Sequence, residues 1–128
     1  MATDSLVNQQ KLDAGRELVD HLKSAAIDVT AAFWAQESYD ESWYLYIASS
    51  MVDSDGPARA YSKVYGELLD KPEIVVAPSE IKLIGAKSPL AAEVVAIQNR
   101  GNAPLDTRYR GRQLGDLFID DAYFYHVK

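Results

Sequence analysis

Two neighbouring segments in which apolar and polar residues alternate constrain the fold of this chain most strongly. The segments "IDVTAAFWAQ" (27–36) and "WYLYIAS" (43–49) both repeat with a period of two, which is the period of a β-strand. The segment between them, "ESYDES", is polar and short. We therefore predict a β-hairpin, and placing the odd-numbered residues of both strands on one buried face requires an odd number of loop residues.

Helical spacing of apolar residues predicts three helices in the rest of the chain. The first covers about residues 5–26 and has one apolar stripe. The second covers about residues 55–71, with Asp55 as its N-cap and Pro57 in its first turn. The third begins at Ser88-Pro89 and ends at 99–101.

Two further β segments complete the predicted fold. A short strand is expected around 81–84, and the segment 105–127 is expected to form a second hairpin with a turn near Gly115. The adjacent Asp120 and Asp121 interrupt the alternation, which indicates a β-bulge. The predicted fold class is α+β: a largely antiparallel sheet of about five strands with about three helices packed mainly on one face.

The composition indicates a single α+β domain covering residues 1–128. A chain of 128 residues with 48% apolar residues can bury one hydrophobic core. The net charge of −6 disfavours binding to nucleic acid phosphates or to an anionic membrane. There is no cysteine, no basic and apolar leader at the N-terminus, and no long apolar segment, so we expect a cytoplasmic protein without a membrane span.

Three aromatic residues of the first hairpin are the first candidate binding residues. With helices on one face only, the alternation places Trp34, Tyr44 and Tyr46 together on the outer face of the sheet. Exposed Trp and Tyr are typical of binding hot spots, so this face is expected to contact a protein partner or a second copy in a homodimer. The alternative is that the third helix packs over these rings.

Three arginines are the second group of candidate binding residues. Arg108, Arg110 and Arg112 alternate along a predicted strand and would project from one face. Guanidinium groups bind oxyanions bidentately, so this stripe suits a phosphate, a nucleotide or an acidic segment of a partner. The structural alternative is a cross-strand ion pair in which Arg110 lies opposite Asp120.

A metal-dependent phosphodiesterase or nuclease is the alternative function. Glu80 and Lys82 would share a face of a strand, and Asp53 or Asp55 would join Glu80 in holding a metal ion. We favour structural roles for these residues, because carboxylates and lysines of this kind are common in turns, helix caps and edge strands.

No motif points to a cofactor or to a catalytic centre. The chain lacks the glycine-rich nucleotide motifs, the Gly-x-Ser-x-Gly motif and the His-Glu-x-x-His motif. We expect no cofactor, no metal and no catalytic residues. The predicted function is a non-enzymatic binding or regulatory module. A small-molecule pocket lined by Tyr61, Tyr65, Phe124 and Trp43 stays open.

The chain also resembles short bacterial proteins that have no assigned function. The resemblance is carried by "DVTAAFWAQESYDESWYLYIAS", "MVDSDGPARAY" and "FIDDAYFYHV". It spans most of the chain and implies a bacterial, cytoplasmic origin. It brings no catalytic motif.

Overall fold

The computed structural model describes residues 9–38, 42–100, 107–109, 113–115 and 117–127. The helical elements are α1 (Gln9–Ser24), α2 (Ser50–Asp55), α3 (Pro57–Asp70), the 3-10 turn η2 (Pro78–Glu80) and α4 (Pro89–Arg100). The strands are β1 (Ala31–Glu37), β2 (Trp43–Ser49), β3 (Ile81–Gly85), β4 (Thr107–Tyr109), β5 (Gln113–Leu114) and β6 (Leu117–Phe124).

The strands form a mostly antiparallel sheet. Its order is β3-β2-β1-β6-β4, and β5 pairs with β6 outside this path. Among the strand pairs of the described residues, β2 with β3 alone is parallel. A parallel neighbour needs a crossover, and the chain makes it through α2, α3 and η2. The predicted α+β class with a largely antiparallel sheet is confirmed.

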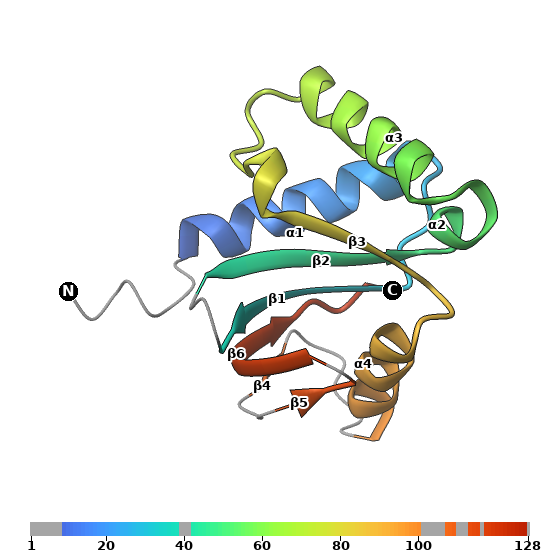
Figure 1. Cartoon of the computed structure of the whole chain (residues 1–128). Helices are drawn as coiled ribbons and strands as arrows, with labels where there is room; N and C mark the ends of the chain where they lie inside the picture. Colours follow the sequence, from blue (N-terminus) through green and yellow to red (C-terminus); the bar gives the residue numbers. More distant parts are fainter. Residues whose placement is uncertain (1–8, 39–41, 101–106, 110–112, 116, 128) are drawn as a thin grey trace.

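Helices cover both faces of the sheet, in contrast to the prediction that they pack mainly on one. Figure 1 shows α1 and α3 on one side and α4 on the other. The buried apolar residues accordingly form two clusters, one under α1 and α3 and one under α4. The reason is visible in β1, where all seven residues are buried. A strand that is buried on both faces needs a layer on each side.

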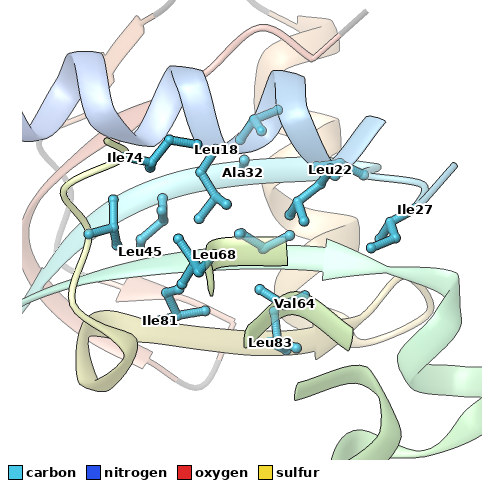
Figure 2. Packing of buried hydrophobic residues seen from close by; sticks show 14 of the residues in the cluster. Leu18, Leu22, Ile27, Ala32, Leu45, Val64, Leu68, Ile74, Ile81 and Leu83 are labelled. Atoms are coloured by element: carbon cyan, nitrogen blue, oxygen red, sulfur yellow. The ribbon is translucent and has the colours of Figure 1, made fainter. Parts of the chain in front are cut away.

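The larger core lies between the sheet and the pair α1 and α3 (Figure 2). Leu18 and Leu22 point from α1 into this core, and Val64 does so from α3. They meet Leu45 of β2 and Leu83 of β3. These helical residues recur at three- and four-residue spacing, which is why the two helices could be predicted from the sequence.

The register of the first hairpin differs from the prediction. Trp34 lies opposite Leu45, and Gln36 lies opposite Trp43, so even-numbered residues of β1 share a face with odd-numbered residues of β2. The Glu37 N–H donates to the carbonyl oxygen of Ser42, which leaves an even-numbered loop. The odd loop was predicted by assuming one buried face, whereas both faces are buried here.

The crossover after β2 begins with a short helix that the sequence pattern did not indicate. Ser49 is the N-cap of α2, and its hydroxyl accepts from the Met51 N–H at 3.2 Å. Asp55 is the last residue of α2, so the prediction that it caps the following helix is wrong. Gly56 precedes α3 with φ at 90°, a conformation that favours glycine, and Pro57 takes the first position of α3 as expected.

A hydrogen-bonded lock joins α1 to the end of β6. The Trp34 indole N–H donates to the Tyr125 hydroxyl oxygen at 2.9 Å, and this hydroxyl donates to the Leu12 carbonyl oxygen at 2.6 Å. Arg16 donates to the His126 carbonyl oxygen at 2.8 Å. The lock satisfies two buried polar side-chain groups, and it requires a very close approach of Tyr125 to Gly15 of α1.

Candidate functional site

Buried polar residues gather at one end of the sheet. Among the described residues, the buried polar or charged ones are Gln36, Glu37, Ser49 and Asp121. Gln36 and Asp121 lie opposite one another on β1 and β6, and Glu37 follows Gln36 directly. Three of the four therefore lie where β1 ends, with Gln36 opposite Trp43 on the α1 side of the sheet and Glu37 beside Tyr46 on the α4 side. Ser49, at the other end of β2, is accounted for as a helix cap.

A β-bulge shapes this end of the sheet, as the adjacent aspartates predicted. Gln36 pairs with Asp121, but Glu37 pairs with Ile119, which leaves Asp120 as the extra residue of β6. The Asp120 carboxylate accepts from the Ser38 hydroxyl at 3.0 Å. Bulges often occur beside functional sites, because they redirect side chains at the end of a strand pair.

Glu37 is the centre of a charged network on the α4 side of the sheet. Its carboxylate oxygen Oε2 accepts from the Lys82 ammonium at 2.7 Å and from the Tyr46 hydroxyl. The Lys82 side chain crosses β2 to reach Glu37, and its Nζ lies 4.0 Å from the centre of the Tyr44 ring. The Glu37 side chain is 1% exposed, whereas that of Lys82 is 38% exposed. The network therefore joins a buried carboxylate to an ammonium group at the surface.

The energetics of this network point to a role beyond stability. Removing a carboxylate from water costs several kcal/mol in a protein, and partners in good geometry, which here include the Lys82 ammonium and the Tyr46 hydroxyl, only about offset this cost. Apolar residues of similar size are often neutral or stabilising in such positions. A buried charge beside a bulge is therefore typical of a functional site, where a side chain must be held in one orientation.

The predicted aromatic face does not exist as a shared exposed surface. Trp34 is buried under α1, while Tyr46 is buried on the opposite face of the sheet, with its ring stacked on Phe33 at 5.0 Å between centroids. Tyr44 is half-buried on the α4 side, next to Lys82. The prediction that Trp34, Tyr44 and Tyr46 lie together on an open face is wrong for two reasons. The hairpin register places Trp34 on the face opposite Tyr44 and Tyr46, and a second helical layer covers the face of Tyr46.

The predicted arginine stripe is mostly outside the described residues. The backbone of Arg108 lies in β4, opposite Tyr123 of β6, while Arg110 and Arg112 are not described. In its described part, β4 runs antiparallel to β6 and towards the bulge. The expected pairing of Arg110 with Asp120 also lies outside the described residues.

The residues of the nuclease alternative are not brought together. Glu80 accepts from Lys11 of α1, whereas Lys82 extends across the opposite face, so the two do not share a face as predicted. Asp53 lies against Gly85 at the far end of β3, roughly 15 Å from Glu80 for a strand of this length. Asp55 is exposed on α2. Within the described part of the chain, no three acidic or histidine residues are placed to hold a metal ion.

The pocket suggested by aromatic residues does not form either. Tyr61, Tyr65 and Trp43 pack against the core under α1 and α3, whereas Phe124 belongs to the core on the other face. Phe124 is a core residue, and the other three rings pack against the core on the opposite side of the sheet.

A separate hollow lies between α1 and the segment after α3. It has a volume of about 350 Å³, and its lining residues are Glu17, Asp20, His21, Ser24, Lys71, Glu73 and Ile74. The His21 Nε2 atom lies 2.9 Å from the Glu67 carboxylate. A hydrogen bond from the Glu73 backbone N–H, together with the charge of Lys71, lowers the pKa of Glu73. This hollow is polar and acidic, and it is distinct from the network around Glu37.

Comparisons with known proteins found no relative of this chain. No family model, curated protein or solved structure matches the chain. In the described residues, none of the helices is long and apolar enough to cross a membrane. The bacterial origin, the cytoplasmic location and the homodimer stay predictions.

The sequence did not single out Glu37, which was assigned to the polar hairpin loop. The available signal was its spacing: Glu37 follows Ala31, Phe33 and Ala35 at intervals of two and so falls on their face. Lys82 was singled out, but for a different partner. Its true partner could not be found from sequence spacing, because the contact joins β3 to β1 across the intervening strand β2.

Proposed function

We propose that this protein is a non-enzymatic binding module that holds an oxyanion of its ligand or partner at Lys82. The proposal keeps the function class predicted from the sequence and moves the binding surface to the end of the sheet beside the bulge. The observation that carries it is the buried Glu37 carboxylate, which holds the part-exposed Lys82 ammonium in place over Tyr44.

The division of roles follows from the geometry. Glu37 is a positioning residue, because it is buried and contacts Lys82 rather than solvent. Lys82 supplies the charge and the N–H donors, and carboxylate or phosphate oxygens are the groups that such donors bind. An ammonium that is already fixed loses less side-chain entropy on binding, which favours affinity. Tyr44 supplies an aromatic surface next to the charge.

The predicted arginines extend the same proposal. Arg108, Arg110 and Arg112 bind a second anionic group, since Arg108 pairs with Tyr123, which packs on the α1 side of the sheet, whereas Lys82 lies on the α4 side. Replacing Arg110 and Arg112 with alanine should weaken anion binding without unfolding the domain. Unchanged affinity in a titration at fixed salt would remove the arginines from the proposal.

Thermal unfolding in phosphate tests the role of Lys82. The thermal unfolding of four proteins is measured in phosphate and in chloride at equal ionic strength. They are wild type, Lys82→Met, Lys82→Arg and the control Lys63→Met, which removes an exposed lysine of α3. Phosphate stabilises every variant to some extent by exclusion from the surface. Specific binding adds about 1.4 kcal/mol at ten times the Kd. We expect this stabilisation by specific binding in wild type and in Lys63→Met. It should be smaller in Lys82→Arg and absent in Lys82→Met.

A second anion identifies the source of the oxyanion. If acetate reproduces the added stabilisation, the site takes a carboxylate, and if phosphate alone does so, it takes a phosphate group. An equal response of wild type and Lys82→Met to both anions contradicts the proposal.

A further inference from the structure

The outer edge of β3 is closed by a side chain from α3. The sheet ends at β3, because β2 is its one strand neighbour in the described residues. The backbone N–H of Leu83 donates to the Tyr61 hydroxyl oxygen at 3.0 Å. Successive N–H groups of a strand point to opposite sides, and Leu83 uses the side that faces away from β2. The Tyr61 hydroxyl thus occupies the place of a carbonyl oxygen from a further strand.

The Ile81 end of this edge is also closed to strand addition. The Ile81 N–H, which lies on the same side as that of Leu83, donates to the Pro78 carbonyl oxygen of η2. The strand is only five residues long, and Lys82 stands near its middle. A short strand is a recognised means of preventing association between sheet edges, whereas the Lys82 side chain runs over β2 to Glu37 and away from this edge. Leu83, in the middle of β3, is the edge position protected by a side chain.

We propose that Tyr61 keeps the sheet monomeric at this edge by blocking the addition of β3 from a second copy of the chain. The occupant follows from the strand itself: two exposed β3 edges related by a two-fold axis would pair as antiparallel strands. Loss of the Tyr61 hydroxyl leaves the Leu83 N–H without its acceptor at an edge, where a carbonyl oxygen of a second chain can replace it. This inference does not depend on the proposed oxyanion site.

A matched pair of variants separates this role from a general effect on α3. Tyr61→Phe removes the hydroxyl at the edge. Tyr65→Phe removes a hydroxyl one turn further along the same helix, where it donates to the Pro78 carbonyl oxygen at 3.3 Å. Both variants keep the aromatic ring, and Tyr61→Ala additionally removes the ring from the edge. Circular dichroism and thermal unfolding establish which variants are folded.

The readouts are amide hydrogen exchange and molar mass by light scattering over a hundredfold range of concentration. At low concentration, the Leu83 amide of Tyr61→Phe should exchange at least tenfold faster than in wild type and in Tyr65→Phe. With rising concentration, Tyr61→Phe and Tyr61→Ala should gain mass, and the Leu83 amide should become protected again. The inference is overturned if both Tyr61 variants keep the wild-type mass throughout, or if they associate while the Leu83 amide stays unprotected.

Discussion

Replacing Gly15 with alanine tests the close approach between α1 and the lock at the end of β6. A Cβ atom on Gly15 would overlap the Tyr125 hydroxyl and would lie 2.8 Å from the Trp34 indole nitrogen. Gly66 of α3 provides the control, because a Cβ atom there would have no neighbour within 4 Å. Both glycines lie inside helices, so both substitutions receive the same gain in helix propensity.

The two substitutions should change stability in opposite directions. Alanine is favoured over glycine in a helix interior by about 0.5–1 kcal/mol, which is the whole effect expected at Gly66. At Gly15, overpacking costs about 1–3 kcal/mol. Displacing the Tyr125 hydroxyl also weakens its hydrogen bonds to Trp34 and Leu12, each contributing about 1 kcal/mol. The net result is a loss of about 1–4 kcal/mol for Gly15→Ala.

Urea unfolding followed by tryptophan fluorescence measures both changes. We expect the midpoint to fall for Gly15→Ala and to rise for Gly66→Ala, with unchanged slopes. If Gly15→Ala were as stable as Gly66→Ala, the close approach of Tyr125 to α1 would be refuted, and with it the account of the lock.

Three further predictions concern the lock, the charged network and the helix cap. Tyr125→Phe should lower the free energy of unfolding by about 1–3 kcal/mol, because the buried Trp34 N–H loses its acceptor. An unchanged free energy in urea unfolding would contradict the hydrogen bond between Trp34 and Tyr125. Lys82→Met should destabilise the protein more than the double variant Glu37→Leu with Lys82→Met, since the single change leaves a buried carboxylate without its ammonium. Equal losses of stability in thermal unfolding would argue against the ion pair of Glu37 and Lys82. For Asp28, slight burial would raise the pKa, but hydrogen bonds from the Ser50 backbone N–H, the Ser50 side chain and the Ser49 hydroxyl outweigh it and lower the pKa. The stabilisation by this carboxylate is therefore full above its unfolded-state pKa and is lost as the pH falls through the folded-state pKa. Between pH 6 and pH 2, wild type should lose more stability than Asp28→Asn, and parallel pH profiles would contradict the hydrogen bonds that Asp28 accepts at the start of α2.

Local patterns in the sequence predicted most elements of the fold. The period of two located β1, β2 and β3, and the helical spacing located α1, α3 and α4, with Pro57 and Pro89 at their first positions. The adjacent aspartates predicted the bulge in β6. These features depend on neighbours in the chain, so the sequence alone contains their signal.

The layering of the fold and the site could not be predicted in the same way. Whether α4 packs beside α1 or on the other face of the sheet depends on contacts between distant segments, and alternation within a strand does not reveal it. That choice buried Tyr46, while the hairpin register placed Trp34 on the opposite face. The pair of Glu37 and Lys82 was hidden for the same reason, since it joins strands that are not adjacent in the sheet.

The most direct test of the central claim, that Lys82 and its neighbours form an oxyanion site, is a phosphate titration of the isotopically labelled wild-type protein followed by NMR. We predict saturable shifts of the amide signals around Lys82 and Tyr44, and of the Lys82 ammonium itself, with much smaller shifts around Lys63 on α3. Shifts that are spread evenly over the surface, or that stay linear up to high phosphate concentration, would contradict the proposed site.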